Sequence, residues 1–537
     1  MKKKLLAIFI CLVMVVGLLP TVAFAAENYG LYVNGEQFTS EKLSIVCGEG
    51  TAAYDPNTKT LSLNNSVITN GGKSDENPKY GIRVVGDTDL TIKLSGTNSI
   101  TLANGGGIFA DGSSDNYNII GGGKLTIDVK WDALYTLNGN ISISEGAELD
   151  IKSAEGSGIT SYNKGKISID SAKVKSFAYY SAASAKELEV KNNSEVVLNS
   201  SEDYFNAAYM GDEKGAGRIE IINSKVEATS YYPALYTEGN LTVNGGEVRC
   251  TSTADSAIWT KGNILIKGGA KVTTDGKYPM GGEGTFTVEE AEIDAKNTNP
   301  NNVPAIYCEP VIADGYHLTY AKAVDSEGTG IDLLSSGTQY FAFYKNVHFI
   351  TKAFYPVSIV VTPDGLTNVV IKVNGQKVTG SVKLEAGNYP VEVTADNCKA
   401  YTGNITITAD EATHTQTIAM AYLPADYTKV DAAIEKANAL NKDDYKDFTA
   451  VANAVKAVVR GKNITEQAEV DKMAKAIEDA VAALEKKPAS TKPGTTEQSP
   501  QTGYTSNLAL WIALLFISGG VVTGVTVISK KKKRSVR

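Results

Sequence analysis

The chain has 537 residues, which exceeds the usual size of one domain and predicts two to four domains. Hydrophobic residues make up 42% of the chain and charged residues 21%, a composition typical of a globular protein rather than a disordered one. The formal net charge of −8 argues against nucleic-acid binding, which needs a basic face, and three histidines leave little material for His-based catalysis or a His-rich metal site.

Residues 1–25 have the three parts of a secretory signal peptide. Three lysines at positions 2 to 4 precede an apolar run from Leu5 to Leu19, and Ala23 and Ala25 supply small residues at the −3 and −1 positions. Cleavage is therefore expected before Ala26, and the mature protein is expected to be secreted. A short transmembrane anchor is the weaker alternative, because the apolar run is below bilayer-spanning length.

A repeat occupies most of the next segment, residues 26–352. A small residue, usually followed by an apolar one, recurs at intervals of 23 to 26 residues. The pairs are Gly81-Ile82, Gly107-Ile108, Ala133-Leu134, Gly158-Ile159, Ala183-Ser184, Ala208-Tyr209, Ala234-Leu235, Ala257-Ile258, Gly281-Gly282 and Ala305-Ile306. In most repeats a second alternating strand follows the pair, and a third, shorter strand closes the repeat.

Three short strands in each repeat, with no helical segment between them, are typical of a parallel β-helix. About ten coils are expected, which corresponds to a rod of about 50 Å at ~4.8 Å per strand. The region resembles the right-handed β-helix superfamily, and more specifically the β-helical "carbohydrate-binding" modules of secreted clostridial proteins. This resemblance implies a mainly β fold with a carbohydrate-binding or adhesive function.

Aromatic residues recur at one position in the first strand of the repeat. The position follows an inward-facing apolar residue, so alternation places it on the outer surface. It holds Phe109, Tyr135, Tyr236, Trp259 and Tyr307. Exposed aromatic rings stack on the apolar faces of sugar rings, so these five residues are the candidate glycan-binding row. The alternative is that stacked aromatic rings only stabilise the β-helix.

A second set of aromatic residues precedes the first strand, as the pairs 179/180, 204/205 and 231/232. The first two pairs lie 25 residues apart, which is one repeat. We therefore expect them to stack at a corner of the β-helix.

An enzyme is the main alternative to a binding protein, because β-helices also carry polysaccharide lyases and hydrolases. A hydrolase needs two or three aspartates on one coil, and a lyase needs a basic residue beside a carboxylate-bound Ca²⁺. Asp128 and Asp132, near Trp131, are the best carboxylate pair, but the usual hydrolase spacings are missing. We therefore expect no catalytic residue, no cofactor and no metal site. A purely structural stalk is the third interpretation.

Four cysteines follow the predicted signal peptide, at Cys47, Cys250, Cys308 and Cys398. They are well separated and have no metal-binding spacing, so buried thiols are expected.

Residues 353–422 alternate with period two between turn signals such as Asn374-Gly375 and Gly387-Asn388. The pattern predicts a small antiparallel β-sandwich. The stretch from Lys383 to Tyr389 resembles the PEGA-type module of bacterial envelope proteins, which implies an architectural role.

Residues 424–487 are rich in alanine and charge, with apolar residues at helical spacing. Turn material at 441–444 and 460–463 separates three apolar faces, so we expect a three-helix bundle. The segment resembles the FIVAR modules of Gram-positive surface proteins, which implies a spacer.

The last segments have the order of a linker, a short motif, an apolar stretch and a basic tail. Residues 488–498 are rich in Pro, Thr and Ser and predict an extended linker. Residues 508–528 are uncharged and long enough for a transmembrane helix, and the basic residues of 530–537 should stay cytoplasmic. The motif between them is Ser499, Pro500, Gln501, Thr502 and Gly503.

Together, residues 499–537 resemble the cell-wall sorting signal of Gram-positive surface proteins. The usual pentapeptide of that family is Leu-Pro-x-Thr-Gly, and Ser499 stands where the family has Leu. The resemblance implies that a sortase cleaves between Thr502 and Gly503 and joins the chain covalently to peptidoglycan at the cell surface. Retention as an uncleaved membrane protein is the alternative.

Both processed ends are basic, and this changes the expected charge of the mature protein. They carry nine lysines and arginines and no acidic residue, so their removal changes the net charge from −8 to −17. A strongly acidic protein repels anionic polymers. A neutral or amino-bearing glycan, for example on a host surface, is therefore the expected ligand, and nucleic acid is not.

Overall fold

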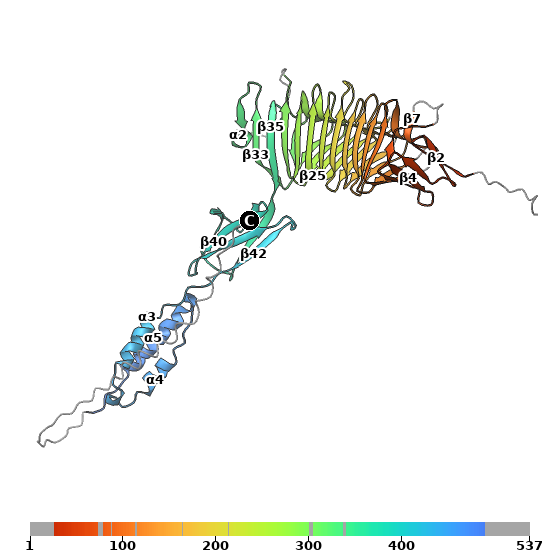
Figure 1. The fold of residues 1–537 in the computed structure, drawn as a ribbon. Helices are drawn as coiled ribbons and strands as arrows, with labels where there is room; N and C mark the ends of the chain where they lie inside the picture. The colour runs from red at the N-terminus through yellow and green to blue at the C-terminus, as the bar shows by residue number, and fades with distance from the viewer. Residues whose placement is uncertain are drawn as a thin grey trace, which may run out of the picture. The chain divides into compact units, whose positions relative to one another are not determined.

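A computed structural model of the chain describes residues 26–72, 79–86, 89–112, 115–163, 165–212, 214–299, 304–336 and 340–488 (Figure 1). The chain divides into two compact units between Ala421 and Tyr422. The signal peptide predicted at 1–25, the linker from 489 onward and the sorting signal predicted at 499–537 lie outside the described residues.

The first unit is built on a parallel β-helix, which confirms the interpretation of the repeat. Successive coils add one strand to each of three sheets, and Figure 1 shows these strands side by side along the helix axis. The first sheet contains nine parallel strands, β7 (Lys79–Val84), β10 (Gly105–Ala110), β13 (Leu134–Thr136), β16 (Ile159–Ser161), β19 (Ala183–Ala185), β22 (Ala208–Met210), β24 (Leu235–Thr237), β26 (Ser256–Thr260) and β29 (Tyr278–Gly282).

The other two sheets are built in the same way and join through two long strands, β23 (Arg218–Ser230) and β25 (Asn240–Ser252), which belong to both. The second sheet also contains β5 (Thr60–Asn64), β8 (Leu90–Ser95), β11 (Tyr117–Ile120), β14 (Ile141–Ile143), β17 (Lys166–Asp170), β20 (Glu187–Lys191), β27 (Ile264–Lys267), β30 (Phe286–Val288) and β32 (Pro310–Ile312). The third sheet also contains β6 (Val67–Ile68), β9 (Thr97–Leu102), β12 (Lys124–Val129), β15 (Glu148–Ser153), β18 (Lys173–Ala178), β21 (Glu195–Ser200), β28 (Ala270–Gly276) and β31 (Ala291–Asn297).

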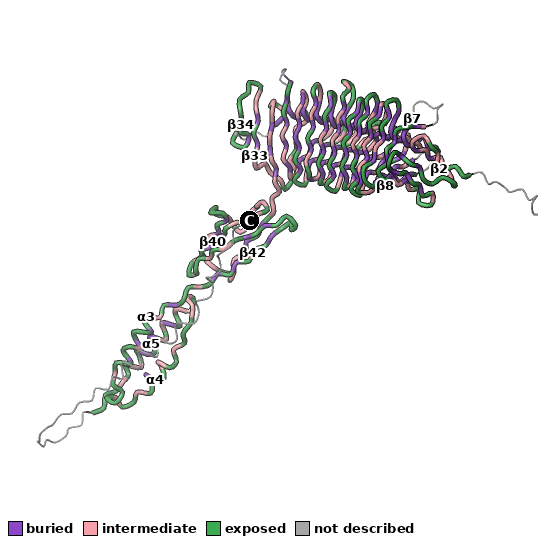
Figure 2. Tube along the Cα trace, viewed as in Figure 1, coloured by how far each residue is buried: buried purple, intermediate pink, exposed green. Residues whose placement is uncertain are grey.

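Alternation along each strand produces the core. In β18, buried and exposed side chains alternate residue by residue, and Figure 2 shows this alternation along the coils. Like residues meet from coil to coil, as where Ile127 lies between Ile100 and Ile151. Burying one such side chain contributes about 1.5–3 kcal/mol, and the apolar interior is continuous from Leu31 to Phe349.

Asparagine side chains hold the corner that precedes the second sheet. The Oδ1 atom of Asn116 accepts a hydrogen bond from the N–H of Asn140 at 2.8 Å, and Oδ1 of Asn140 accepts one from the N–H of Lys166 at 2.8 Å. Asn240 accepts a bond from Asn263 in the same way at 2.8 Å. Each bond satisfies a backbone N–H at the corner where the chain enters the second sheet.

Antiparallel strands close both ends of the β-helix. At the N-terminal end, β1 (Asn28–Val33) pairs with β2 (Glu36–Thr39) and β7, while β3 (Ser44–Cys47) and β4 (Gly50–Asp55) lead into β5. At the C-terminal end, β33 (Tyr316–Val324) pairs with β34 (Gly330–Asp332) and β35 (Asn346–Ala353), and β35 pairs with β31. The short helix α2 (Leu333–Ser336) packs against β33 and β34. These strands cover sheet edges that would otherwise leave backbone groups unpaired.

The predicted number of coils is therefore too high. The structure has about nine coils rather than ten, because the first sheet ends at β29 and the tenth repeat pair, Ala305-Ile306, forms no strand of its own. The last repeat pair contributes only a single bridge, between Met280 and Ile306. The right-handed sense of the coil stays a prediction from the resemblance.

Three of the repeat pairs are displaced from their predicted register. The inward residues of these coils are Ala183, Ala208 and Met280, not Ser184, Tyr209 and Gly282. Two of the inward positions hold alanine, so the rule of a small residue before a large apolar one fails there. At the third, Met280, the preceding residue is Pro279, whereas the other coils have glycine or alanine before the inward residue.

A small β-sandwich ends the first unit. One sheet contains β36 (Tyr355–Thr362), β39 (Ser381–Leu384) and β42 (His414–Ala419), and the other contains β37 (Val370–Val373), β38 (Gln376–Val378), β40 (Gly387–Thr394) and β41 (Tyr401–Ile407). The predicted antiparallel arrangement is wrong for one pair, because β36 and β42 run parallel. Alternation of apolar and polar residues predicts strands and their buried face. It does not predict the relative direction of two paired strands, such as β36 and β42, when strands of the other sheet lie between them in the chain.

The second unit contains three helices, α3 (Thr428–Asn438), α4 (Thr449–Lys456) and α5 (Gln467–Ala482), with 3-10 turns η1 (Lys442–Asp444) and η2 (Ile464–Glu466). Their apolar faces meet in one core that includes Val430, Val451, Val470 and Ile477. In the described part of the chain, no helix is both long and apolar enough to span a bilayer. The transmembrane helix predicted at 508–528 lies outside that part.

Candidate functional site

The outward positions of the first sheet form one row along the helix axis. The row is Arg83, Phe109, Tyr135, Thr160, Ser184, Tyr209, Tyr236, Trp259, Gly281 and Tyr307. All five predicted aromatic residues belong to it, as strand alternation requires. The small residues at 160 and 184 divide the aromatic residues into two groups.

The group nearer the N-terminus is a ladder of stacked rings. The ring centroids of Tyr80 and Phe109 lie 4.4 Å apart, those of Phe109 and Tyr135 5.4 Å, and those of Tyr135 and Tyr162 6.2 Å. Both faces of the Phe109 ring are therefore occupied by neighbours. Rings packed in this way stabilise the sheet and present little free face to a ligand, which favours the structural interpretation for Phe109 and Tyr135.

The second group surrounds an open cavity of about 610 Å³, which we call the aromatic groove. Seven aromatic side chains line it: Tyr204, Tyr209, Tyr232, Tyr236, Trp259, Tyr278 and Tyr307. Tyr209 and Tyr236 stack with centroids 5.4 Å apart, whereas the rings of Trp259 and Tyr307 are tilted by 58° at 5.7 Å. Tyr307 is 57% exposed, so this end of the groove is open to solvent.

The corner aromatic residues form part of the same groove. The rings of Tyr180 and Phe205 meet across one coil with centroids 4.5 Å apart, as expected for the corner, but they are tilted by 47° rather than stacked face to face. Tyr204 and Tyr232 pack 5.9 Å apart and line the groove. The groove therefore combines the outward row of the first sheet with the neighbouring corner.

Gly281 makes room for the Trp259 ring. A Cβ atom at Gly281 would lie 2.8 Å from Cζ3 of Trp259 and 2.8 Å from Cβ of Tyr307. Such separations are closer than carbon atoms approach without displacement. The gap in the row at this position therefore allows the two rings to come together.

A charged pair holds the Tyr236 hydroxyl. Tyr236 Oη donates to Oε1 of Glu238 at 2.6 Å, and Nζ of Lys261 lies 2.6 Å from Oε2 of the same carboxylate. Burial, followed by the bond to Glu238, raises the pKa of Tyr236 to about 12. Burial of Glu238 favours its neutral form, but Lys261 and Tyr236 outweigh this and lower its pKa. The tyrosine therefore stays neutral and the carboxylate charged at physiological pH.

Polar groups also line the groove at Asn206, Asp255 and Ser256. Asn206 Nδ2 donates to the carbonyl of Pro233 at 2.9 Å, and Oδ1 of Asp255 accepts from the N–H of Ser256 at 2.7 Å. These bonds fix the side chains beside the aromatic rings. An amide, a carboxylate and a hydroxyl in these positions are suited to bonding ligand hydroxyl groups.

Tyr209 is the residue of the row that the sequence analysis missed. The repeat register placed it inward, whereas its neighbour Ala208 faces the core. A usable signal was present, because Ala207-Ala208-Tyr209 has the same order as Ala234-Leu235-Tyr236 and Ala257-Ile258-Trp259. An aromatic residue three positions into this pattern indicates the outward row better than the size of the central residue does.

The aspartates weighed for catalysis lie in different settings. Asp128 is exposed on β12, opposite Thr101 and Lys152. Asp132 lies beyond the strand, where its Oδ1 accepts from the N–H of Ser157 at 2.8 Å, and burial raises its pKa. The bond of Asp132 to the next coil favours a structural role at the corner.

The four described cysteines are free thiols. Cys47 and Cys250 are buried, and burial raises the pKa of Cys250 far above its ordinary value. Cys308 and Cys398 are only half-buried, so the expectation of buried thiols is wrong for these two. Among the residues that the structure describes, no three His, Cys, Asp or Glu side chains group so as to hold a metal ion.

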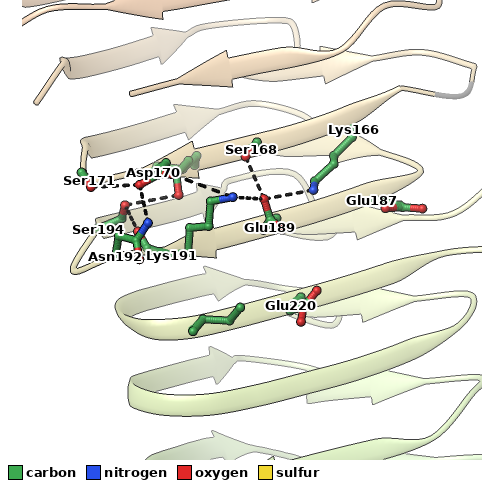
Figure 3. Close-up of polar contacts among 12 residues, drawn as sticks. Lys166, Ser168, Asp170, Ser171, Glu187, Glu189, Lys191, Asn192, Ser194 and Glu220 are labelled. Atoms are coloured by element: carbon green, nitrogen blue, oxygen red, sulfur yellow. Dashed lines mark hydrogen bonds and ion pairs between the residues drawn. The ribbon is translucent and has the colours of Figure 1, made fainter. Parts of the chain in front are cut away.

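The outward face of the second sheet is occupied by its own charge pairs (Figure 3). Oε2 of Glu189 lies 3.0 Å from Nζ of Lys166 and 2.8 Å from Nζ of Lys191, and it accepts from Ser168 Oγ at 3.0 Å. These contacts link β17 and β20 on the outward face of this sheet.

Comparisons with protein-family models, with curated proteins and with solved structures found no match for this chain. Beyond the β-helix itself, the resemblances of the sandwich, the helical unit and the C-terminal segment stay predictions from the sequence.

Proposed function

We propose that this chain is a surface protein that binds glycans in the aromatic groove of its β-helix. The observation that carries the proposal is the groove of about 610 Å³, in which seven aromatic side chains lie beside fixed polar ones. Sugar rings have apolar faces that stack on aromatic rings and hydroxyl groups that need hydrogen-bond partners. The groove supplies both kinds of group in one place.

The charge of the chain supports a neutral or amino-bearing glycan. The predicted mature chain, residues 26–502, has a net charge of −17. An acidic surface slows and weakens the approach of acidic polymers but does not oppose neutral ones. Asp255 adds a carboxylate to the lining of the groove itself, whereas the carboxylate of Glu238 is balanced by Lys261.

Binding by residues 26–502 to a glycan array tests the proposal. The double variant Tyr236→Ala/Trp259→Ala removes two stacking surfaces and should lose most of the binding. Phe343→Ala is a matched control, because Phe343 is 79% exposed and lies in the turn before β35, outside the groove. Binding that survives the double variant would contradict the proposal.

We also propose that a sortase attaches the chain to peptidoglycan through the 499–503 motif. The support is the order of motif, apolar stretch and basic tail in the sequence, together with the signal peptide. In this arrangement the sandwich, the helical unit and the linker would separate the groove from the wall. Adhesion to a glycan-bearing surface is the role that follows.

Polysaccharide cleavage is the alternative function, and Asp128 and Asp132 are its candidates. The structural contact of Asp132 with Ser157 weighs against it. Release of reducing or unsaturated ends from a bound polysaccharide would replace the binding proposal with an enzymatic one.

A further inference from the structure

A polar hollow adjoins the aromatic groove on the first sheet. It has a volume of about 770 Å³ and lies where the outward row has its small residue, Ser184. Tyr162 borders it from the N-terminal aromatic ladder. Tyr209 lines both the hollow and the aromatic groove, so the two cavities are neighbours along the helix axis.

We propose that the ligand is an extended glycan that runs along the β-helix axis and occupies the polar hollow and the aromatic groove together. This inference rests on the proposed function and adds the length and direction of the ligand. The row supports it, because Ser184 in the hollow and Trp259 in the groove are three strand spacings apart, or about 14 Å. One sugar ring is too short to contact both cavities.

Polar side chains from successive coils line the hollow in fixed positions. Asn163 Nδ2 donates to Oδ1 of Asn138 at 2.9 Å, so these two amides meet across one coil. Lys186 Nζ lies 3.1 Å from Oδ2 of Asp212. Because these groups already hold one another, they need little ordering to receive the hydroxyl groups of a sugar.

Backbone contacts keep Asp212 charged in this setting. Its Oδ1 accepts from the N–H of Ala216 at 3.0 Å and from that of Lys214 at 2.9 Å. The bond from Ala216 first, and then Lys186, lowers the pKa of Asp212. A charged carboxylate paired with a lysine offers both hydrogen-bond acceptors and donors to the hydroxyl groups of a sugar.

The aromatic groove and the polar hollow bind different parts of the ligand. Aromatic rings in the groove bind sugar faces, and the amides and the charged pair of the hollow bind hydroxyl groups. A short oligosaccharide fills only the groove, whereas a longer one gains the contacts of the hollow. Affinity should therefore rise when the chain becomes long enough to pass Tyr209.

Calorimetric titration with an oligosaccharide series of the array-identified glycan tests this inference. Ser184→Trp fills the hollow and should weaken the longest oligosaccharides about tenfold, to the affinity of the short ones, while the short ones bind as before. Ser142→Trp makes the same change on the outward face of the second sheet and should leave the series unchanged. An unaltered length dependence in Ser184→Trp would overturn the inference.

A second variant protects the test against misfolding. Asn138→Ala/Asn163→Ala removes the amides without adding bulk, and it should also reduce the affinity for long oligosaccharides only. If both variants bind the whole series like the wild type while Tyr236→Ala/Trp259→Ala does not bind, the groove functions alone and the extended ligand is wrong. If no member of the series binds the wild type, the proposed function itself fails.

Discussion

At the scale of single residues, the site depends on one residue without a side chain. Gly281 occupies an outward position where neighbouring coils have tryptophan and tyrosine, and its lack of a Cβ lets Trp259 approach Tyr307. A stacking platform needs its rings in fixed orientations, since binding energy is lost when they must be ordered by the ligand. In the proposed site, the glycine would therefore act on the ligand through Trp259.

Gly281→Ala should move the Trp259 ring and weaken glycan binding about threefold to tenfold, with little change in the far-UV circular dichroism. The reason is that the added carbon would meet Cζ3 of Trp259 at 2.8 Å. Gly122→Ala is the matched control, because a Cβ there meets nothing within 4 Å. Equal affinities for wild type and Gly281→Ala would show that the ring position does not matter.

At the scale of elements, outward charge pairs hold adjacent strands of the second sheet. Glu189 on β20 binds Lys166 on β17 and Lys191 on its own strand (Figure 3). Burial favours the neutral form of Glu189, but the bonds from Lys191, Lys166 and Ser168 outweigh it and lower the pKa to about 2.

The pH dependence of this pair has a definite sign. In the unfolded chain a glutamate titrates near 4.3, so the folded state binds the proton more weakly. The stabilisation is therefore complete above pH ~4.3 and is lost as the pH falls towards the folded pKa of about 2. Glu189→Gln should lower the free energy of unfolding by about 1 kcal/mol at pH 7, because the lysine partners are partly exposed to water.

Thermal unfolding at several pH values checks this prediction. The difference between wild type and Glu189→Gln should shrink steadily below pH 5. Glu195→Gln is the control, since Glu195 and Lys173 form an exposed pair at 3.6 Å that contributes little at any pH. A constant difference for Glu189→Gln down to pH 2 would contradict the assignment of the low pKa.

The elements also show how far the sequence predicts the fold. Repeat length and alternation identified the three strands of each coil and the outward row, because burial depends on the local order of residues. The closing strands were not recognised, since they alternate in the same way but pair in the opposite direction. The predicted register of the repeat was wrong at Ala183 and Ala208, because alanine occupies an inward position there that holds a larger residue in most other coils.

The candidate site was predicted only in part, for a related reason. The sequence identified the stacking positions Tyr236, Trp259 and Tyr307, but not the groove, because its walls come from different coils and from a corner. The polar hollow arises from the small size of Ser184 between larger neighbours. Such a cavity depends on how side chains from several strands meet, which no single repeat contains.

At the scale of the whole molecule, the proposed binding groove and the proposed sorting motif lie on one chain. With the proposed processing of both ends, the chain would carry a net charge of −17, which would oppose acidic partners. The proposed wall anchor would depend on Thr502, whose carbonyl the sortase would transfer. Thr502→Ala should move the protein from the cell-wall fraction to the membrane fraction, as measured by fractionation and immunoblotting. Unchanged wall attachment would refute sorting at this motif.

The central claim is that a glycan contacts Trp259, and tryptophan fluorescence tests it most directly. Residues 26–502 contain only Trp131 and Trp259, which lie about five strand spacings, or ~24 Å, apart along the axis. Trp131→Phe therefore leaves Trp259 as the sole emitter, and Trp259→Phe leaves Trp131. Titration with the array-identified glycan should change the emission of Trp131→Phe in a saturable manner and leave that of Trp259→Phe unchanged. Binding without any change at Trp259, or with a change only at Trp131, would contradict the account.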